Sequence, residues 1–243
     1  MRKVEKSLLQ QPHWLLCFCI AVIANVQIAA SGEELAWELT QKHRFYGQEI
    51  IHLTRRGMKV DQTKFSTSFI QKTGDDTYYC YSKANKVLFV GHGDSASEMA
   101  RIEVLASLST HSLELFDWSR MQWKKEKTAK MFGLPVEEYV AQRTNFRWEI
   151  WVTRALNMPE WMTDEHDRWA KLPHLNGMPL KATLFNQSGA KTEVLVTLGV
   201  RKIKPSDVDF TCPTGFKRVN NLTSVMAAQS DSFLKDVEES LGH

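Results

Sequence analysis

The sequence has few cysteines, four among 243 residues. This scarcity excludes a small disulfide-framework fold and most cysteine-rich zinc modules. The chain also lacks a large excess of either charge, because 31 Lys and Arg against 28 Asp and Glu leave +3. That balance excludes a dedicated nucleic-acid binder, so we expect no nucleic-acid partner. No internal repeat, low-complexity tract or linker is present, and a single domain is the simplest organisation.

The first thirty residues are typical of an export signal. Arg2, Lys3 and Lys6 form a basic start, and Trp14 to Ala24 is an apolar run of 11 residues. This run is shorter than the roughly 20 residues of a membrane-spanning helix. We therefore expect a signal peptide over residues 1–30 and a periplasmic or extracellular mature protein. The alternative is an uncleaved N-terminal anchor; otherwise we expect only transient membrane contact.

Removal of this signal leaves a nearly neutral chain with two cysteines. Three basic residues and one acidic residue lie within it, so 28 and 27 remain. The remaining thiols are Cys80 and Cys212, which could form a disulfide in an oxidising compartment. The alternative is two buried free thiols, because a sequence does not give the Cα separation that a disulfide requires.

Alternation of apolar and polar residues with a period of two dominates the mature chain and predicts β-strands. Short polar turns separate several of these segments, as at Lys83-Ala84-Asn85, and predict antiparallel hairpins. The expected strands are residues 35–40, 50–54, 57–61, 65–70, 77–82, 86–90, 118–131, 138–143, 145–153, 178–185, 191–203 and 208–212.

Three segments have helical patterns instead. A capping box begins at Ser95, residues 156–172 are rich in helix formers and aromatic residues, and residues 222–241 have one apolar side. A sheet this large needs helices on one face. We therefore expect an α+β fold, with a large curved antiparallel sheet (a half-barrel) and two or three helices covering one face. The expected units are a sheet domain over 31–221 and a C-terminal amphipathic helix over 222–243.

Several short motifs follow one another along the mature chain. An early strand follows a glycine turn, and a hairpin comes next. Two central strands carry glycine, tyrosine, tryptophan and threonine, a later strand begins with glycine, an apolar residue and proline, and a Phe-x-x-Pro precedes a glycine–aromatic pair. The residues concerned are Arg56–Val60, Tyr78–Phe89, Gly133, Glu138–Tyr139, Glu149–Thr153, Gly177–Leu180, Asp207–Pro213 and Gly215–Phe216.

The order and spacing of these motifs resemble the LolA-like superfamily of periplasmic lipoprotein carriers, and most of all a branch of uncharacterised secreted bacterial proteins. The helix expected after residue 222 departs from the family pattern. The resemblance implies a half-barrel that is open on one side, with helices as a lid and space for acyl chains or another apolar ligand. A lipid or a lipoprotein acyl chain is the partner that it implies.

Tryptophan is concentrated in the middle of the chain. Seven tryptophans remain after residue 30, and five of them lie between residues 118 and 161. Alternation places four apolar residues of 145–153 on one strand face, next to two more on the preceding long strand. Such a face could line an apolar pocket, or it could be packed core. The residues proposed to bind a ligand are Met121, Trp123, Phe146, Trp148, Ile150 and Val152.

One short motif resembles a catalytic sequence. Gly93-Asp94-Ser95 after an apolar strand is similar to the nucleophile block of GDSL-type esterases. The Gly-x-Asn-Asp and Asp-x-x-His blocks of that family are absent, and the capping box accounts for Ser95 without catalysis. We expect no enzymatic activity and assign no catalytic residue.

A second cluster contains groups that ligate metals. Asp164, Glu165, His166 and Asp167 are consecutive, but adjacent residues of a helix do not share a face. An acidic helix start is the simpler interpretation. The other histidines have no ligand spacing such as His-x-x-x-His. We expect neither a metal nor a cofactor.

A basic run, Lys124-Lys125-Glu126-Lys127 with Lys130, lies on an expected strand. It is interpreted as a solvated sheet face. The alternative is an electrostatic contact with anionic lipid headgroups or with a negatively charged partner.

Two main functions follow from the sequence. The first is an exported, non-enzymatic carrier or sensor that binds a lipid or another apolar ligand in the half-barrel. The second is an envelope scaffold of the same fold with a packed core, which binds another protein through its sheet or its C-terminal helix. The esterase is a distant third.

Overall fold

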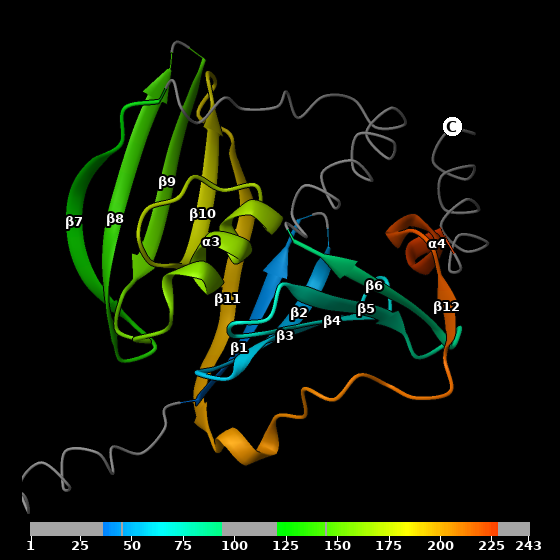
Figure 1. Cartoon of the computed structure of the whole chain (residues 1–243). Coiled ribbons are helices and arrows are strands. Elements are labelled where there is room, and N and C mark those ends of the chain that lie inside the picture. Colours follow the sequence, from blue (N-terminus) through cyan, green and yellow to red (C-terminus); the bar gives the residue numbers. More distant parts are fainter. Residues whose placement is uncertain (1–35, 45, 94–120, 144, 228–243) are drawn as a thin grey trace, which may run out of the picture. The chain divides into compact units, whose positions relative to one another are not determined.

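A twelve-stranded sheet dominates the computed structural model, which describes residues 36–44, 46–93, 121–143 and 145–227 (Figure 1). The other elements among these residues are two α-helices and a 3-10 turn. The strands are β1 (Ala36–His43), β2 (Gly47–Thr54), β3 (Gly57–Gln62), β4 (Thr67–Lys72), β5 (Thr77–Ser82), β6 (Val87–His92), β7 (Lys124–Met131), β8 (Leu134–Arg143), β9 (Phe146–Thr153), β10 (Met178–Asn186), β11 (Lys191–Ile203) and β12 (Lys217–Val219).

Two antiparallel meanders form this sheet. The strand order is β12-β6-β5-β4-β3-β2-β1-β11-β10-β9-β8-β7, so one meander runs from β1 to β6 and the other from β7 to β11. They join where β1 pairs with β11, with Leu39 opposite Val200 and a register shift after Thr40. Only the short β12 is parallel to its neighbour β6. The prediction of a large antiparallel sheet is confirmed.

Near the C-terminus, the observed strands differ from the predicted ones. Residues 208–212 form no strand, although Val208 and Phe210 are buried against Ile70, Tyr81 and Leu88. Their alternation therefore reflects packing on a sheet face rather than pairing in a ladder. The three-residue β12, which the sequence did not indicate, follows this segment.

One helix longer than two turns lies among the described residues. This helix, α3 (Glu160–Trp169), begins directly after Pro159, four residues later than the predicted start at 156. Proline is restricted to the first turn of a helix and biases the residue before it away from helical geometry. None of the described helices is both long and apolar enough to cross a membrane.

The expectation of two or three covering helices is met in part. α3 lies against one face of the sheet, while α4 (Leu222–Ala227) is a short helix that contacts β5, β6 and β12. The predicted helix that begins at Ser95, the Ser95 motif itself and the C-terminal segment beyond residue 227 lie outside the described residues.

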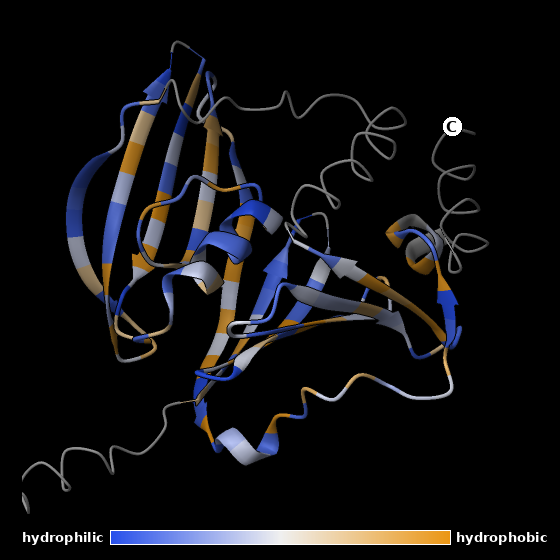
Figure 2. Cartoon of the chain, viewed as in Figure 1, coloured by the Kyte–Doolittle hydropathy of each residue, from blue (hydrophilic) through white to orange (hydrophobic). Residues whose placement is uncertain are grey.

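The apolar core follows the alternation of the strands on the face that α3 covers. In Figure 2 apolar and polar bands alternate along β8 to β11. One cluster joins Met162 and Trp169 of α3 to the first meander, and a second lies over β9, β10 and β11. The first cluster includes Leu39, Ile51, Leu53, Met58, Val60, Phe69, Tyr78 and Cys80.

The two cysteines of the described residues are free thiols. Cys80 of β5 packs in the cluster beneath α3. Cys212 packs in another cluster with Tyr81, which follows Cys80 directly on β5. Successive side chains of a strand point to opposite faces, so the two thiols lie on opposite sides of the sheet. The Cys80–Cys212 disulfide considered from the sequence is therefore not formed, and burial raises the pKa of Cys80 to about 12.

Gly91 has a packing role on β6. A Cβ atom at this position would overlap the ring of Tyr78, which is itself buried. We expect Gly91→Ala to lower the free energy of unfolding by about 1–3 kcal/mol, because overpacking forces the neighbouring ring to move. Gly199→Ala is the matched control, since nothing lies within 4 Å of its added Cβ. Urea denaturation compares them, and equal losses would contradict the steric explanation.

Candidate functional site

The buried side of α3 carries polar residues as well as apolar ones. Glu165, His166 and Asp167 are only 6, 5 and 2% exposed. The sequence placed them in an acidic helix start, but they lie in the second half of α3. Their side chains diverge, and each engages a different part of the molecule. We call four buried residues the polar seam: His43 and Glu49 of the sheet, and His166 and Asp167 of α3.

His166 is held by a glutamine from the sheet. Gln41 of β1 donates its Nε2 hydrogens to the carbonyl of Pro179 at 2.9 Å and to Thr197 Oγ1 at 3.0 Å. Its Oε1 is then an acceptor, so His166 Nε2 donates to it at 2.9 Å. This assignment leaves His166 Nδ1 as a bare acceptor, which is buried and has no hydrogen-bond partner. Burial lowers the pKa of His166 to about 3, so the ring is neutral.

His43 joins the end of α3 to β1. Its Nε2 donates to the carbonyl of Ala170 at 3.3 Å, and its Nδ1 accepts from the Tyr46 backbone N–H at 3.4 Å. The imidazole also stacks on the Tyr46 ring, with 4.8 Å between ring centroids. Burial lowers the pKa of His43 to about 4. This histidine is therefore neutral as well, with its proton on Nε2.

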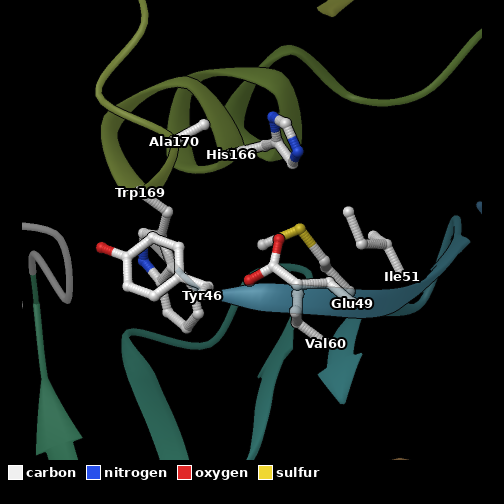
Figure 3. A pocket seen from close by; sticks show the side chains of 8 residues that line it. Tyr46, Glu49, Ile51, Val60, His166, Trp169 and Ala170 are labelled. Carbon is white, nitrogen blue, oxygen red and sulfur yellow. The ribbon is translucent and has the colours of Figure 1, made fainter. Parts of the chain in front are cut away.

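Glu49 extends from β2 toward α3, as Figure 3 shows. Gln62 Nε2 donates to its Oε1 at 2.8 Å, and Thr67 donates in turn to Gln62 at 3.1 Å. Burial raises the pKa of Glu49 to about 7, and the Gln62 hydrogen bond opposes that shift. A carboxyl group is thus kept largely protonated in mildly acidic solution.

Asp167 contacts the loop that follows α3. His174 Nδ1 lies 3.2 Å from its Oδ2 and 2.7 Å from Asp164 Oδ1. Burial, with the charge of Asp164, raises the pKa of Asp167 well above its usual range. Asp164 and Asp167 thus both contact His174 and connect α3 to the loop that follows it.

The space between α3 and the sheet is almost filled. A cavity of about 10 Å³ remains (Figure 3), close to the smallest volume that admits one water molecule. Both apolar side chains and the polar seam enclose it. Its lining residues are Tyr46, Glu49, Ile51, Met58, Val60, His166, Trp169 and Ala170.

The apolar wall predicted from the sequence exists as one cluster. Trp148, Ile150 and Val152 of β9 are at most 2% exposed and pack with residues of β10 and β11. Met121, Trp123 and Phe146 are partly buried against the same cluster. The structure therefore brings all six residues together, and their role in ligand binding stays a prediction.

The polar seam was missed by the sequence analysis. One signal for it was present, because Trp37, Leu39, Gln41 and His43 continue a single alternating face from apolar to polar residues. A polar residue that continues an apolar face indicates either exposure or a buried partner. The partners lie about 125 residues further along the chain, on α3.

Comparison with known proteins finds distant structural likenesses only. No protein-family model matches the chain, and no curated protein matches it. An uncharacterized conserved protein from Thermus thermophilus is 10% identical with a TM-score of 0.42, over 83% of this chain and 98% of that one. The MucA/MucB complex of Pseudomonas aeruginosa is 11% identical with a TM-score of 0.39, over 77% and 58%.

A domain from Vibrio parahaemolyticus described as a putative outer membrane lipoprotein-sorting protein is also similar. It is 15% identical with a TM-score of 0.23, over 76% of this chain and 94% of that domain. At these scores, the likeness neither assigns the chain to a family nor argues its function.

Proposed function

We propose that this protein is an exported, non-enzymatic interaction module that binds another protein through its outer surface. The observation that carries the proposal is how little space remains beneath α3 among the residues that the structure describes. The space beneath α3 holds a cavity of about 10 Å³, whereas ligand pockets commonly measure about 300–1,000 Å³. Of the two functions derived from the sequence, a scaffold with a packed core fits this geometry better. The proposed export rests on the signal-like pattern of residues 1–30.

The absence of catalysis is part of the same proposal. Hydrogen bonds within the protein engage the two buried histidines and Glu49 of the polar seam. Groups closed off in this way reach no substrate. They hold α3 to the sheet instead.

A carrier of an apolar ligand is the second candidate. The partly buried Met121, Trp123 and Phe146 favour it, since they extend the β9 cluster toward solvent. An acyl chain could occupy this wall if its covering elements moved. Such a ligand would be a lipid or the acyl chain of a lipoprotein.

Native mass spectrometry and a fluorescent fatty-acid titration distinguish the two candidates. We expect purified protein of ligand-free mass and no saturable uptake of the acyl probe. Cross-linking in the cell envelope, followed by mass spectrometry, should identify a protein neighbour that binds the purified protein one to one. Stoichiometric acyl uptake, accompanied by faster amide exchange in α3, would overturn the interaction module in favour of the carrier.

A further inference from the structure

Among the strands that the structure describes, β7 forms one end of the sheet and pairs only with β8. Its residues Lys124 to Lys130 are all exposed, on both faces of the strand. Figure 2 shows a predominantly hydrophilic β7, and Figure 1 shows its position at the edge. An edge strand presents unpaired N–H and C=O groups, to which another extended segment can add. At the opposite end of the sheet, β12 has only three residues.

Both faces beside this edge are basic. Four lysines and one glutamate give β7 a net charge of +3. Lys124 and Lys127 lie opposite Val140 and Glu138, which share one face of β8. Lys125 and Lys130 lie opposite Tyr139 and Pro135, which share the other face. Because paired residues share a face, each face of β7 carries two ammonium groups.

Two of the lysines are already neutralised. Lys125 pairs with Glu137, and Lys127 lies 3.2 Å from the buried carboxylate of Glu138. Lys124 and Lys130 have no ion-pair partner among the residues that the structure describes. They stand near the two ends of β7, one on each face, and leave a positive charge at either end of the free edge.

The positive charge of β7 determines which kind of segment can bind at this edge. A second copy of the chain pairing through β7 would bring four lysines against four, and lysines on edge strands commonly prevent such self-pairing. A segment rich in Asp and Glu would meet opposite charges on both faces while completing the ladder. The backbone would supply affinity, and the charges would supply selectivity.

We propose that the free edge of β7 binds an extended acidic segment of another protein, which adds as a further strand of the sheet. The inference rests on the proposed function, because it identifies the surface and the class of partner for that interaction module. It also gives the lysine run a role beyond that of a solvated face.

The probe for this proposal is a labelled peptide in which Glu alternates with Thr and Val. A peptide with Lys in place of Glu is its counterpart. We expect fluorescence anisotropy to show binding of the acidic peptide alone, weakened by added salt. Amide exchange should slow in residues 124–131 when that peptide is bound.

The decisive variant is Lys124→Glu with Lys130→Glu, which breaks no ion pair of the described structure. We expect its affinity for the acidic peptide to fall by about tenfold, since two attractions become repulsions. Lys83→Glu with Lys204→Glu is the matched control, an equal charge change at exposed lysines away from β7, and should reduce affinity by less than about twofold.

Three results would overturn the inference. They are equal losses in both double variants, peptide binding without slower exchange in β7, and binding to vesicles containing phosphatidylglycerol in place of the peptide. A cross-linked protein partner whose affinity the β7 variant leaves unchanged would refute this surface but keep the interaction module. Acyl uptake would refute the interaction module whichever way β7 behaves.

Discussion

Trp169→Ala should lower the free energy of unfolding by about 3–5 kcal/mol, the usual cost of truncating a buried tryptophan. The side chain is 7% exposed, and its ring packs edge-on against Phe69 of β4 with 4.2 Å between centroids. Its Nε1 also donates to Glu165 at 2.9 Å. The substitution therefore removes apolar contact with the first meander and leaves a buried carboxyl group without this donor.

Trp169→Phe provides the control for this experiment. Phenylalanine keeps an aromatic ring against Phe69 but cannot donate to Glu165, so we expect a clearly smaller loss. Urea unfolding gives the free energies, and amide exchange over residues 160–169 shows whether α3 opens locally. A loss of less than about 1 kcal/mol for Trp169→Ala would mean that α3 contributes little to stability and that its contact with the sheet is not the anchor we describe.

We expect the wild-type protein to lose stability as the pH rises through 7, and we expect Glu49→Gln to remove this loss. Because the folded-state pKa of Glu49 is raised from 4.5 to about 7, the native state binds more protons than the unfolded state between these values. Its contribution to stability is therefore complete below pH 4.5 and is lost as the pH rises through 7. The shift corresponds to about 3 kcal/mol.

The measurement is the difference in unfolding free energy between Glu49→Gln and the wild type as a function of pH. We expect this difference to change in favour of the variant by about 3 kcal/mol from pH 4.5 to 8 and then to remain level. Glu126→Gln on the exposed β7 is the control for the same substitution at the surface. A flat difference for Glu49→Gln would show that the carboxyl group is solvated in the native protein.

The two histidines of the polar seam change stability with pH in the opposite direction to Glu49. Their folded-state pKa values are lowered from 6.5 to about 4 for His43 and about 3 for His166. The unfolded state then binds more protons below pH 6.5, and stability is lost as the pH falls. Between about pH 4.5 and 6.5 the histidines and the two carboxyl groups, Glu49 and Asp167, offset one another. The net contribution of the polar seam to stability should therefore change little with pH in this window.

The sequence identified the strands more accurately than the helices. Alternation is a local property of a strand that has one buried face, and it placed eleven of the twelve strands at or near their observed positions. It failed at 208–212, where alternate burial occurs without a ladder partner. It also extended the helix at 156 across Pro159, the residue that sets the start of α3.

The apolar wall and the polar seam differ in how far the sequence could predict them. Phe146, Trp148, Ile150 and Val152 belong to one strand, so their common face follows from spacing alone. The seam depends on Gln41 and His43 meeting His166 and Ala170, which no local pattern connects. The two cysteines show the same limit, because their positions on opposite faces depend on how residues 208–212 fold back over β5.

The sequence by itself determined an antiparallel strand-rich domain, its apolar faces and a basic strand near residue 124. Each of these features can be recognised in a short window of the sequence. Only the tertiary structure decided that β1 joins β11, that little space remains beneath α3, and that β7 lies at the edge of the described sheet. These features depend on pairings and desolvation between residues more than a hundred positions apart. The edge position of β7 is what allows its lysines to meet an acidic segment rather than solvent alone.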